Sequence, residues 1–188
     1  MKKKYPLFVL ISIFTFSLLA DGQNLSTTIK VQAMDMATAF MKNDFTTFSK
    51  YMHPGIVSYA GGKEKMKSKM DSVYGAMKLF GVIFKRYWIG DPGEIINYKD
   101  QLQAVLPQST TLKTPFGELT AETSWIVISK DKGESWYFID TNVYKVDNLK
   151  NILPDLSPKL IIPLPKKPKL VPNEVRNKQK IPQAPQCV

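Results

Sequence analysis

Two side chains in this 188-residue chain have the chemistry for acid–base catalysis: the single histidine, His53, and Asp140. The ordinary pKa of histidine is about 6.5, so His53 suits a general base that works near neutral pH. The simpler interpretation is structural: His53 ends a helix, and one of its ring nitrogens bonds a free carbonyl group. Pro54 and Gly55 follow directly, which agrees with the end of a helix at this point.

Asp140 stands at the end of an alternating segment, Trp136-Tyr137-Phe138-Ile139-Asp140. In a strand, Asp140 lies on the same face as Trp136 and Phe138, because side chains alternate between the two faces. If that face lines an interior, burial raises the pKa of the carboxyl group and makes it a usable acid or base. If the strand ends there, Asp140 bonds the amide groups of a turn instead.

Trp125 and Trp136 lie on neighbouring segments joined by the turn Asp131-Lys132-Gly133. Either indole is a candidate for the wall of a ligand site. In a sheet covered by helices, however, such residues more often belong to the core.

The sequence predicts neither a metal site nor a bound cofactor. One histidine, one cysteine at position 187 and no close acidic pair leave no ligand set of useful spacing. A Gly-x-Ser-x-Gly turn and a Gly-rich phosphate loop are both missing.

The elements that position these residues begin with helical patterns. Ser26 can cap a first helix, because apolar residues recur every three or four positions after it. Asp44 can cap a second, short helix that continues the same stripe to Met52. Pro54 stops this stripe, and residues 56–60 read as a short strand.

A third helical pattern follows Gly61-Gly62 and ends at Gly81. Its apolar stripe is rich in methionine, which gives a soft and adaptable packing surface. We interpret the stripe as core rather than as a ligand wall. Its members are Met66, Met70, Val73, Tyr74 and Met77.

From Val82 the period changes to that of strands, which turn signals divide into segments. The predicted strands are 82–90, 94–98, 101–114, 118–130 and 135–141. Hairpin connections imply one antiparallel sheet with a face for the helices, and hence an α+β fold. Pro107 predicts an edge, a bulge or a bend in the third strand.

The two ends of the chain differ from the middle. Residues 1–20 combine three lysines with an apolar run of about 15 residues, shorter than the roughly 20 that span a membrane. They read as a signal peptide, so we expect export to the periplasm or beyond, with no stable membrane span after cleavage. Residues 154–188 form a Pro/Lys-rich tail in which prolines oppose both helix and sheet. Its first part, 156–164, is apolar enough to dock, and the rest is expected to be extended and disordered.

Most of the positive charge lies in these ends. The net charge is +10, but residues 21–158 carry 16 basic and 15 acidic side chains, against 7 and 1 in residues 159–188. A nearly neutral body does not predict nucleic-acid binding. The clustered lysines suit attachment to an anionic envelope polymer, although a solvated tail without a partner is the simpler case.

The order of elements resembles the nuclear-transport-factor-2-like superfamily, which includes SnoaL-like cyclases and ketosteroid isomerases. Residues 44–66 and the strand 133–141 look most like small exported bacterial members without an assigned activity. The resemblance covers about residues 26–153, and we take 21–153 as the domain. It implies a curved antiparallel sheet wrapped around N-terminal helices, a cone whose mouth can hold a ligand, and pairing of two copies through the sheet.

In enzymes of this superfamily an Asp, His or Tyr inside the cone acts as acid or base. By element, the equivalents here are His53, Tyr59 and Asp140, with Tyr87 beside them, but no Tyr and Asp pair matches the isomerases residue by residue. We therefore predict a non-catalytic binding module for a small apolar ligand, lined by Tyr87, Trp125, Trp136 and Phe138. The alternative is a small-molecule isomerase, cyclase or hydratase with Asp140 or His53 as base.

Overall fold

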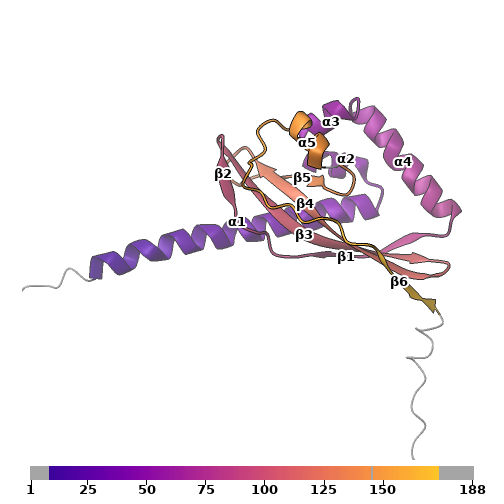
Figure 1. The fold of residues 1–188 in the computed structure, drawn as a ribbon, viewed down its shortest axis with the longest axis horizontal. Coiled ribbons are helices and arrows are strands. Elements are labelled where there is room, and N and C mark those ends of the chain that lie inside the picture. The colour runs from indigo at the N-terminus through magenta and orange to yellow at the C-terminus, as the bar shows by residue number, and fades with distance from the viewer. Residues whose placement is uncertain (1–8, 145, 174–188) are drawn as a thin grey trace, which may run out of the picture.

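The computed structural model describes residues 9–144 and 146–173 of the chain. It shows an α+β protein in which an open, antiparallel, six-stranded sheet packs against the N-terminal helices (Figure 1). The class predicted from the order of helical and strand patterns is confirmed. The start of the predicted signal peptide, residues 1–8, and the predicted tail after residue 173 lie outside the described ranges.

The helices that precede the sheet differ from the predicted ones at two points. They are α1 (Val9–Met41), α2 (Phe45–Phe48), the 3-10 helix η1 (Ser49–Tyr51), α3 (Pro54–Tyr59) and α4 (Lys63–Leu79). The prediction that Ser26 begins a helix is wrong, because α1 runs through it without interruption. Asp44 does cap α2, since its Oδ1 accepts a hydrogen bond from the Thr47 amide at 3.1 Å.

The predicted strand over residues 56–60 is also wrong, because these residues belong to α3. Pro54 occupies the first turn of α3, where a missing N–H costs nothing, so the proline starts a helix here instead of stopping one. His53 is the N-cap of α3 and not the end of the preceding helix: its Nδ1 accepts from the Gly55 amide at 3.1 Å. Ile56 is fully buried, and this packing fixes the helix in place.

The sheet follows the predicted segments closely. Its strands are β1 (Ile83–Ile89), β2 (Ile96–Tyr98), β3 (Gln101–Thr114), β4 (Gly117–Ser129), β5 (Tyr137–Asp140) and β6 (Lys169–Pro172). The order is β1-β3-β4-β5, while β2 pairs with β3 and β6 pairs with β4. The long β3–β4 hairpin lies at the centre of the sheet, and each of the other strands pairs with β3 or β4.

Pro107 marks the place where β3 loses a strand partner, as predicted. Its carbonyl group accepts a hydrogen bond from the Gly90 amide at 2.9 Å, one residue past the end of β1. Proline has no N–H to return this bond, so the pairing of β1 stops there. On its other side Pro107 stays in register with Ser124 of β4.

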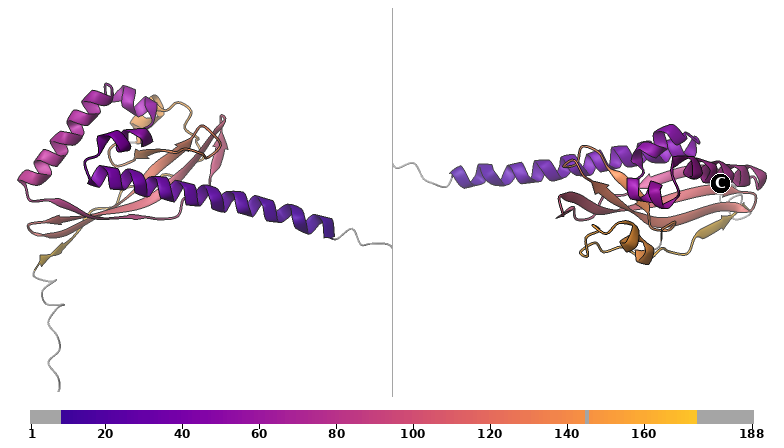
Figure 2. Two further views of the ribbon diagram at one scale, coloured as in Figure 1. Left: turned by 180° about the vertical axis from the view of Figure 1, so that it is seen from behind. Right: turned by 90° about the horizontal axis from the view of Figure 1, so that it is seen from above.

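Two apolar clusters cover the two faces of the sheet. On the inner face, α1 packs against β3, β4 and β5, and the central residues are Ile29, Ala33, Leu106, Val127 and Phe138. On the outer face, α3, the last helix α5 (Val146–Ile152) and the chain after it pack against Ile126, Ile128 and Ile139. Seen from above, α1 and α5 lie on opposite sides of the sheet (Figure 2).

Residues 153–168 cross the outer face from α5 to β6, and we call them the strap (Figure 1). Leu156, Leu160 and Ile162 pack against the outer cluster, so the predicted docking of the early tail is found. The expectation that prolines exclude sheet is wrong for β6, which pairs with Gly117–Thr120 of β4. Pro172 is tolerated there because β6 lies at an edge. Gly117, at φ 150°, lets the strands approach: a Cβ there would lie 2.2 Å from the carbonyl oxygen of Val171.

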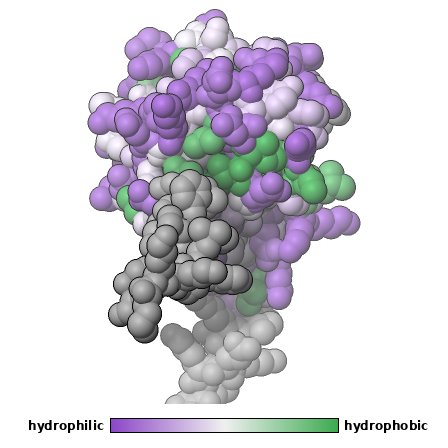
Figure 3. All heavy atoms as spheres, turned by 90° about the vertical axis from the view of Figure 1, so that its left-hand side faces the viewer, coloured by the Kyte–Doolittle hydropathy of each residue, from purple (hydrophilic) through white to green (hydrophobic). Residues whose placement is uncertain are grey.

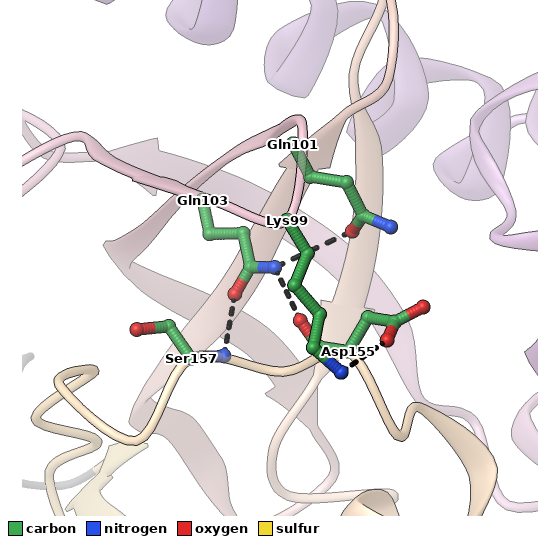
Figure 4. A network of polar contacts seen from close by, with 5 residues as sticks. All are labelled: Lys99, Gln101, Gln103, Asp155 and Ser157. Atoms are coloured by element: carbon green, nitrogen blue, oxygen red, sulfur yellow. Dashed lines mark hydrogen bonds and ion pairs between the residues drawn. The ribbon is translucent and has the colours of Figure 1, made fainter.

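One buried glutamine fastens the strap to β3 (Figure 4). Nε2 of Gln103 donates to the carbonyl oxygen of Asp155 at 2.7 Å, and its Oε1 accepts from the Ser157 amide at 2.8 Å. The side-chain amide thus replaces a pair of backbone hydrogen bonds between β3 and the strap. Lys99 adds an exposed ion pair with Asp155 at 2.8 Å.

The surface seen from the side of β2 and the projecting half of α1 is mostly hydrophilic, with hydrophobic residues gathered near its middle (Figure 3). Among the described residues, none of the helices is both long enough and apolar enough to cross a membrane.

Candidate functional site

A cavity of about 270 Å³ lies between the inner face of the sheet and helices α1, α2 and α4. We call it the inner pocket. Its volume is close to the lower limit of ligand pockets, which commonly measure about 300 to 1,000 Å³. Its lining is mostly apolar, with a few polar groups from α4, β1, β5 and the chain after β5.

One wall of the inner pocket is a run of aromatic side chains in contact. The ring of Tyr87 lies 6.3 Å from Trp125, and Trp125 lies 5.8 Å from Phe138 in an edge-to-face arrangement. Phe40 and Phe48 close the helical side, with their ring centres 5.3 Å apart. Such contacts hold each ring in a fixed orientation, so this wall is largely preformed.

The opposite wall is built from methionines: Met36 from α1, Met52 from the segment before α3, and Met66 and Met70 from α4. Methionine side chains have several rotatable bonds and a polarisable sulfur atom, so they adapt to ligands of different shape. Val73 of α4 lies beside them and is 48% exposed, which places it where the pocket meets solvent.

Asp140 supplies the one carboxyl group of this lining. It pairs with Trp125 across the two strands, and its Oδ2 accepts a hydrogen bond from the indole Nε1 at 3.3 Å. Its Oδ1 accepts from the Asn142 amide at 2.8 Å. Both predicted roles of Asp140 are therefore found together: it bonds a turn amide, and it faces an interior where burial raises its pKa.

Two tyrosine hydroxyl groups join Asp140 in the lining. Burial raises the pKa of Tyr87 to about 12, and burial also raises the pKa of Tyr144. Both groups therefore stay protonated at neutral pH and can donate a hydrogen bond. The arrangement offers a ligand two hydroxyl donors and one carboxyl group in a mainly apolar space, to which α4 adds the exposed Lys69.

His53 lies elsewhere, on the outer face. Its ring packs edge-on against Tyr137, with the ring centres 5.3 Å apart, and Tyr137 projects away from the face that carries Phe138 and Asp140. Burial, with a smaller effect of the Lys130 charge, lowers the pKa of His53 to about 4. The ring is neutral at neutral pH, and its Nδ1 is occupied by the Gly55 amide.

Two other predicted site residues are not part of the pocket lining. Tyr59 is 60% exposed on α3 and touches the site only through Tyr144, whose ring centre is 6.4 Å away. Trp136 is buried in the inner cluster, where its Nε1 donates to the Gly133 carbonyl oxygen at 3.1 Å. The structure thus brings together Tyr87, Trp125, Phe138 and Asp140, and separates them from His53, Tyr59 and Trp136.

The helical half of the pocket was not predicted as a site. Met66, Met70 and Val73 were recognised from their spacing as one helix face, which we interpreted as core. The methionine content of that face was the available signal, since soft side chains suit a wall that rearranges around a ligand.

Within the described ranges, no group of three or more His, Cys, Asp or Glu residues is arranged to hold a metal ion. No protein-family model matches the chain. No curated protein matches it either.

Proposed function

We propose that this protein is a non-catalytic binding module of the nuclear-transport-factor-2-like type that holds a small apolar ligand in the inner pocket. The observation that carries the proposal is the placement of one buried carboxyl group, Asp140, in a cavity lined mainly by apolar side chains, most of them aromatic residues and methionines. The exposed Lys69 of α4 is the one basic residue among the described residues of this lining. A few polar groups in an apolar cavity fix the orientation of a ligand, while the apolar lining supplies most of the affinity.

The polar groups define the ligand further. Asp140, Tyr87 and Tyr144 suit a molecule that is apolar over most of its surface and carries one hydroxyl or carbonyl group. A ligand group with a full negative charge is disfavoured beside Asp140, because two anionic groups that are both removed from water repel each other. The small volume favours a compact, two-ring or short-chain molecule.

A matched pair of probes tests this proposal. Naphthalene and 2-naphthol have the same ring system, and only 2-naphthol carries a hydroxyl group. We expect both to raise the melting temperature of the protein, with the larger shift for 2-naphthol, because a ligand that binds only the folded state stabilises it. No shift with either probe, and none with decanol as a chain-shaped probe, would count against the proposal.

A second function is favoured by the raised pKa of Asp140 in the pocket. A carboxylate of raised basicity beside a protonated tyrosine can remove a proton from the carbon next to a ligand carbonyl group, while the hydroxyl group bonds the oxygen that becomes negative. This is the isomerase alternative with Asp140 alone as base. His53 takes no part, since it lies on the other face of β5.

Deuterium exchange separates the two functions. If Asp140 acts as base, the protein should accelerate the exchange of the protons of 2-tetralone next to its carbonyl group in D2O. Asp140→Asn should remove the acceleration without removing binding. If the unmodified protein binds 2-tetralone but does not accelerate the exchange, the result contradicts the isomerase function and agrees with the binding function.

A further inference from the structure

A second cavity, of about 470 Å³, lies on the outer face of the sheet, away from the inner pocket. Its floor is formed by β1, β3 and β4, and one wall is formed by Leu164 and Lys166 of the strap. We call it the outer groove. No described residue lines both the outer groove and the inner pocket, so the two sites are independent.

The most conspicuous group in the outer groove is an exposed indole. Trp88 of β1 is 55% exposed, although a tryptophan usually contributes to a core or to a contact. Its ring lies close over Gly90: a Cβ at position 90 would be 2.9 Å from Cη2 of the ring and 3.3 Å from Cβ of Pro107. The glycine and the proline therefore allow the indole to lie against the backbone, which holds it in place and leaves its outer face open.

Polar groups continue from this indole in a straight row across the sheet. Trp88 is in register with Ser109 of β3, and Ser109 is in register with Glu122 of β4. All three side chains therefore lie on the outer face, with about 5 Å between neighbouring strands. Lys166 of the strap ends the row, with its Nζ 2.6 Å from Oε2 of Glu122.

The exposed indole, together with the row of polar groups beside it, indicates the chemistry of the ligand. An immobilised, open aromatic ring binds the apolar C–H face of a sugar ring, and a carboxylate, an ammonium group and a hydroxyl group bond sugar hydroxyls. The Glu122 and Lys166 charges compensate each other, which disfavours a strongly anionic polymer. A purely apolar ligand would remove these polar groups from water without bonding them, which costs free energy.

We propose that the outer groove binds a short, neutral oligosaccharide. One sugar ring stacks on Trp88, and the hydroxyl groups of the following sugar bond Ser109, Glu122 and Lys166. The row runs about 10 Å from β1 to β4, two strand spacings, so it accommodates more than one sugar.

Titrations of the full chain with cellotetraose, chitotetraose and maltotetraose, followed by calorimetry, test this proposal. We expect at least one of them to bind, and Trp88→Ala to weaken its binding about tenfold or more. Gly90→Ala keeps the indole but displaces its ring, so it should also weaken binding. Phe116→Ala is the matched control, because Phe116 is another exposed ring, in the turn between β3 and β4, and should leave binding unchanged.

Cooperative thermal unfolding of each variant verifies that it is folded. The proposal is overturned if none of the three oligosaccharides binds, or if Trp88→Ala binds as well as the unmodified protein. Self-association that Trp88→Ala abolishes, without oligosaccharide binding, would also overturn it and would assign the groove to contact between copies of the chain.

Discussion

Asp140 and His53 lie on opposite faces of strand β5: Asp140 is a residue of the strand and faces the inner pocket, whereas His53, the N-cap of α3, packs on Tyr137 at the outer face. The two groups with the best acid–base chemistry in the sequence therefore do not form one site. Asp140 belongs to the proposed ligand site. His53 belongs to the architecture, as the cap of α3.

Asp140→Asn should change the pH dependence of stability. Burial raises the pKa of Asp140 above its ordinary value of 3.8, so this carboxyl group ionises at a lower pH in the unfolded chain than in the folded protein. The unmodified protein therefore loses stability as the pH rises through this range. Asparagine does not ionise, so the variant should gain stability relative to the unmodified protein as the pH rises from 3 toward neutrality. Urea unfolding at a series of pH values between about 3 and 7 measures this difference.

Asp131→Asn is a control for which we expect the opposite change of stability with pH. A hydrogen bond from Ser135 lowers the pKa of Asp131, so its carboxylate stabilises the fold above pH 3.8. This variant should become less stable relative to the unmodified protein over the same pH range. If the two variants change in the same direction, the environment assigned to Asp140 is wrong.

His53→Asn should reduce the sensitivity to acid. The pKa of His53 is about 4, so between pH 6.5 and 4 the unfolded chain binds a proton that the folded protein does not. This contribution to stability is thus complete above pH 6.5 and decreases as the pH falls toward 4. Asparagine keeps an N-cap acceptor without titrating, so the variant should lose less stability in this interval. Equal losses in both proteins, measured by urea unfolding, would contradict the placement of His53.

Gln103→Leu should loosen the strap. The substitution leaves the Ser157 amide and the Asp155 carbonyl group without their partner, which costs about 2 kcal/mol of unfolding free energy. Hydrogen exchange at the Ser157 amide should accelerate strongly. Lys99→Ala is the control at the same contact: it removes an exposed ion pair with Asp155 and the contact of the ammonium group with the Tyr98 ring, and should cost less than about 1 kcal/mol.

Val73→Trp should close the mouth of the inner pocket. Val73 is 48% exposed, so the larger side chain can enter the opening without displacing the core, and stability should change by only about 0.5 kcal/mol. The affinity for 2-naphthol should fall about tenfold or more. Val31→Trp places the same side chain at an exposed position of α1 outside the pocket, and its affinity should equal that of the unmodified protein.

The sheet was predictable because its signals are local. Turn sequences separate β1 to β5, and alternation puts Trp125, Phe138 and Asp140 on one face. The segment after His53 was not predictable in the same way, because proline both ends helices and begins them. The burial of Ile56 against the outer cluster decides between the two, and no local pattern contains that contact.

The structure of the C-terminal part also depends on contacts that local sequence patterns do not contain. Its prolines predict an irregular segment. Lys169–Pro172 nevertheless forms strand β6, which contains Pro172 and pairs with the edge of β4. The apolar composition of residues 156–164 predicts that they dock, but neither the path of the strap nor the outer groove beside it follows from composition, because both depend on where α5 directs the chain. The inner pocket also depends on the fold, since the methionine face of α4 becomes a wall only where the chain places α4 beside the inner face of the sheet.

The most direct test of the ligand site is a titration with 2-naphthol of protein labelled with carbon-13 at its methionine methyl groups. We predict that the signals of Met36, Met52, Met66 and Met70 shift and show contacts to the naphthol ring, because these residues line the inner pocket. Met34, which is 41% exposed outside the pocket, should not change. Unchanged signals from the four pocket methionines, or equal shifts at Met34, would contradict the assignment of the inner pocket as a ligand site.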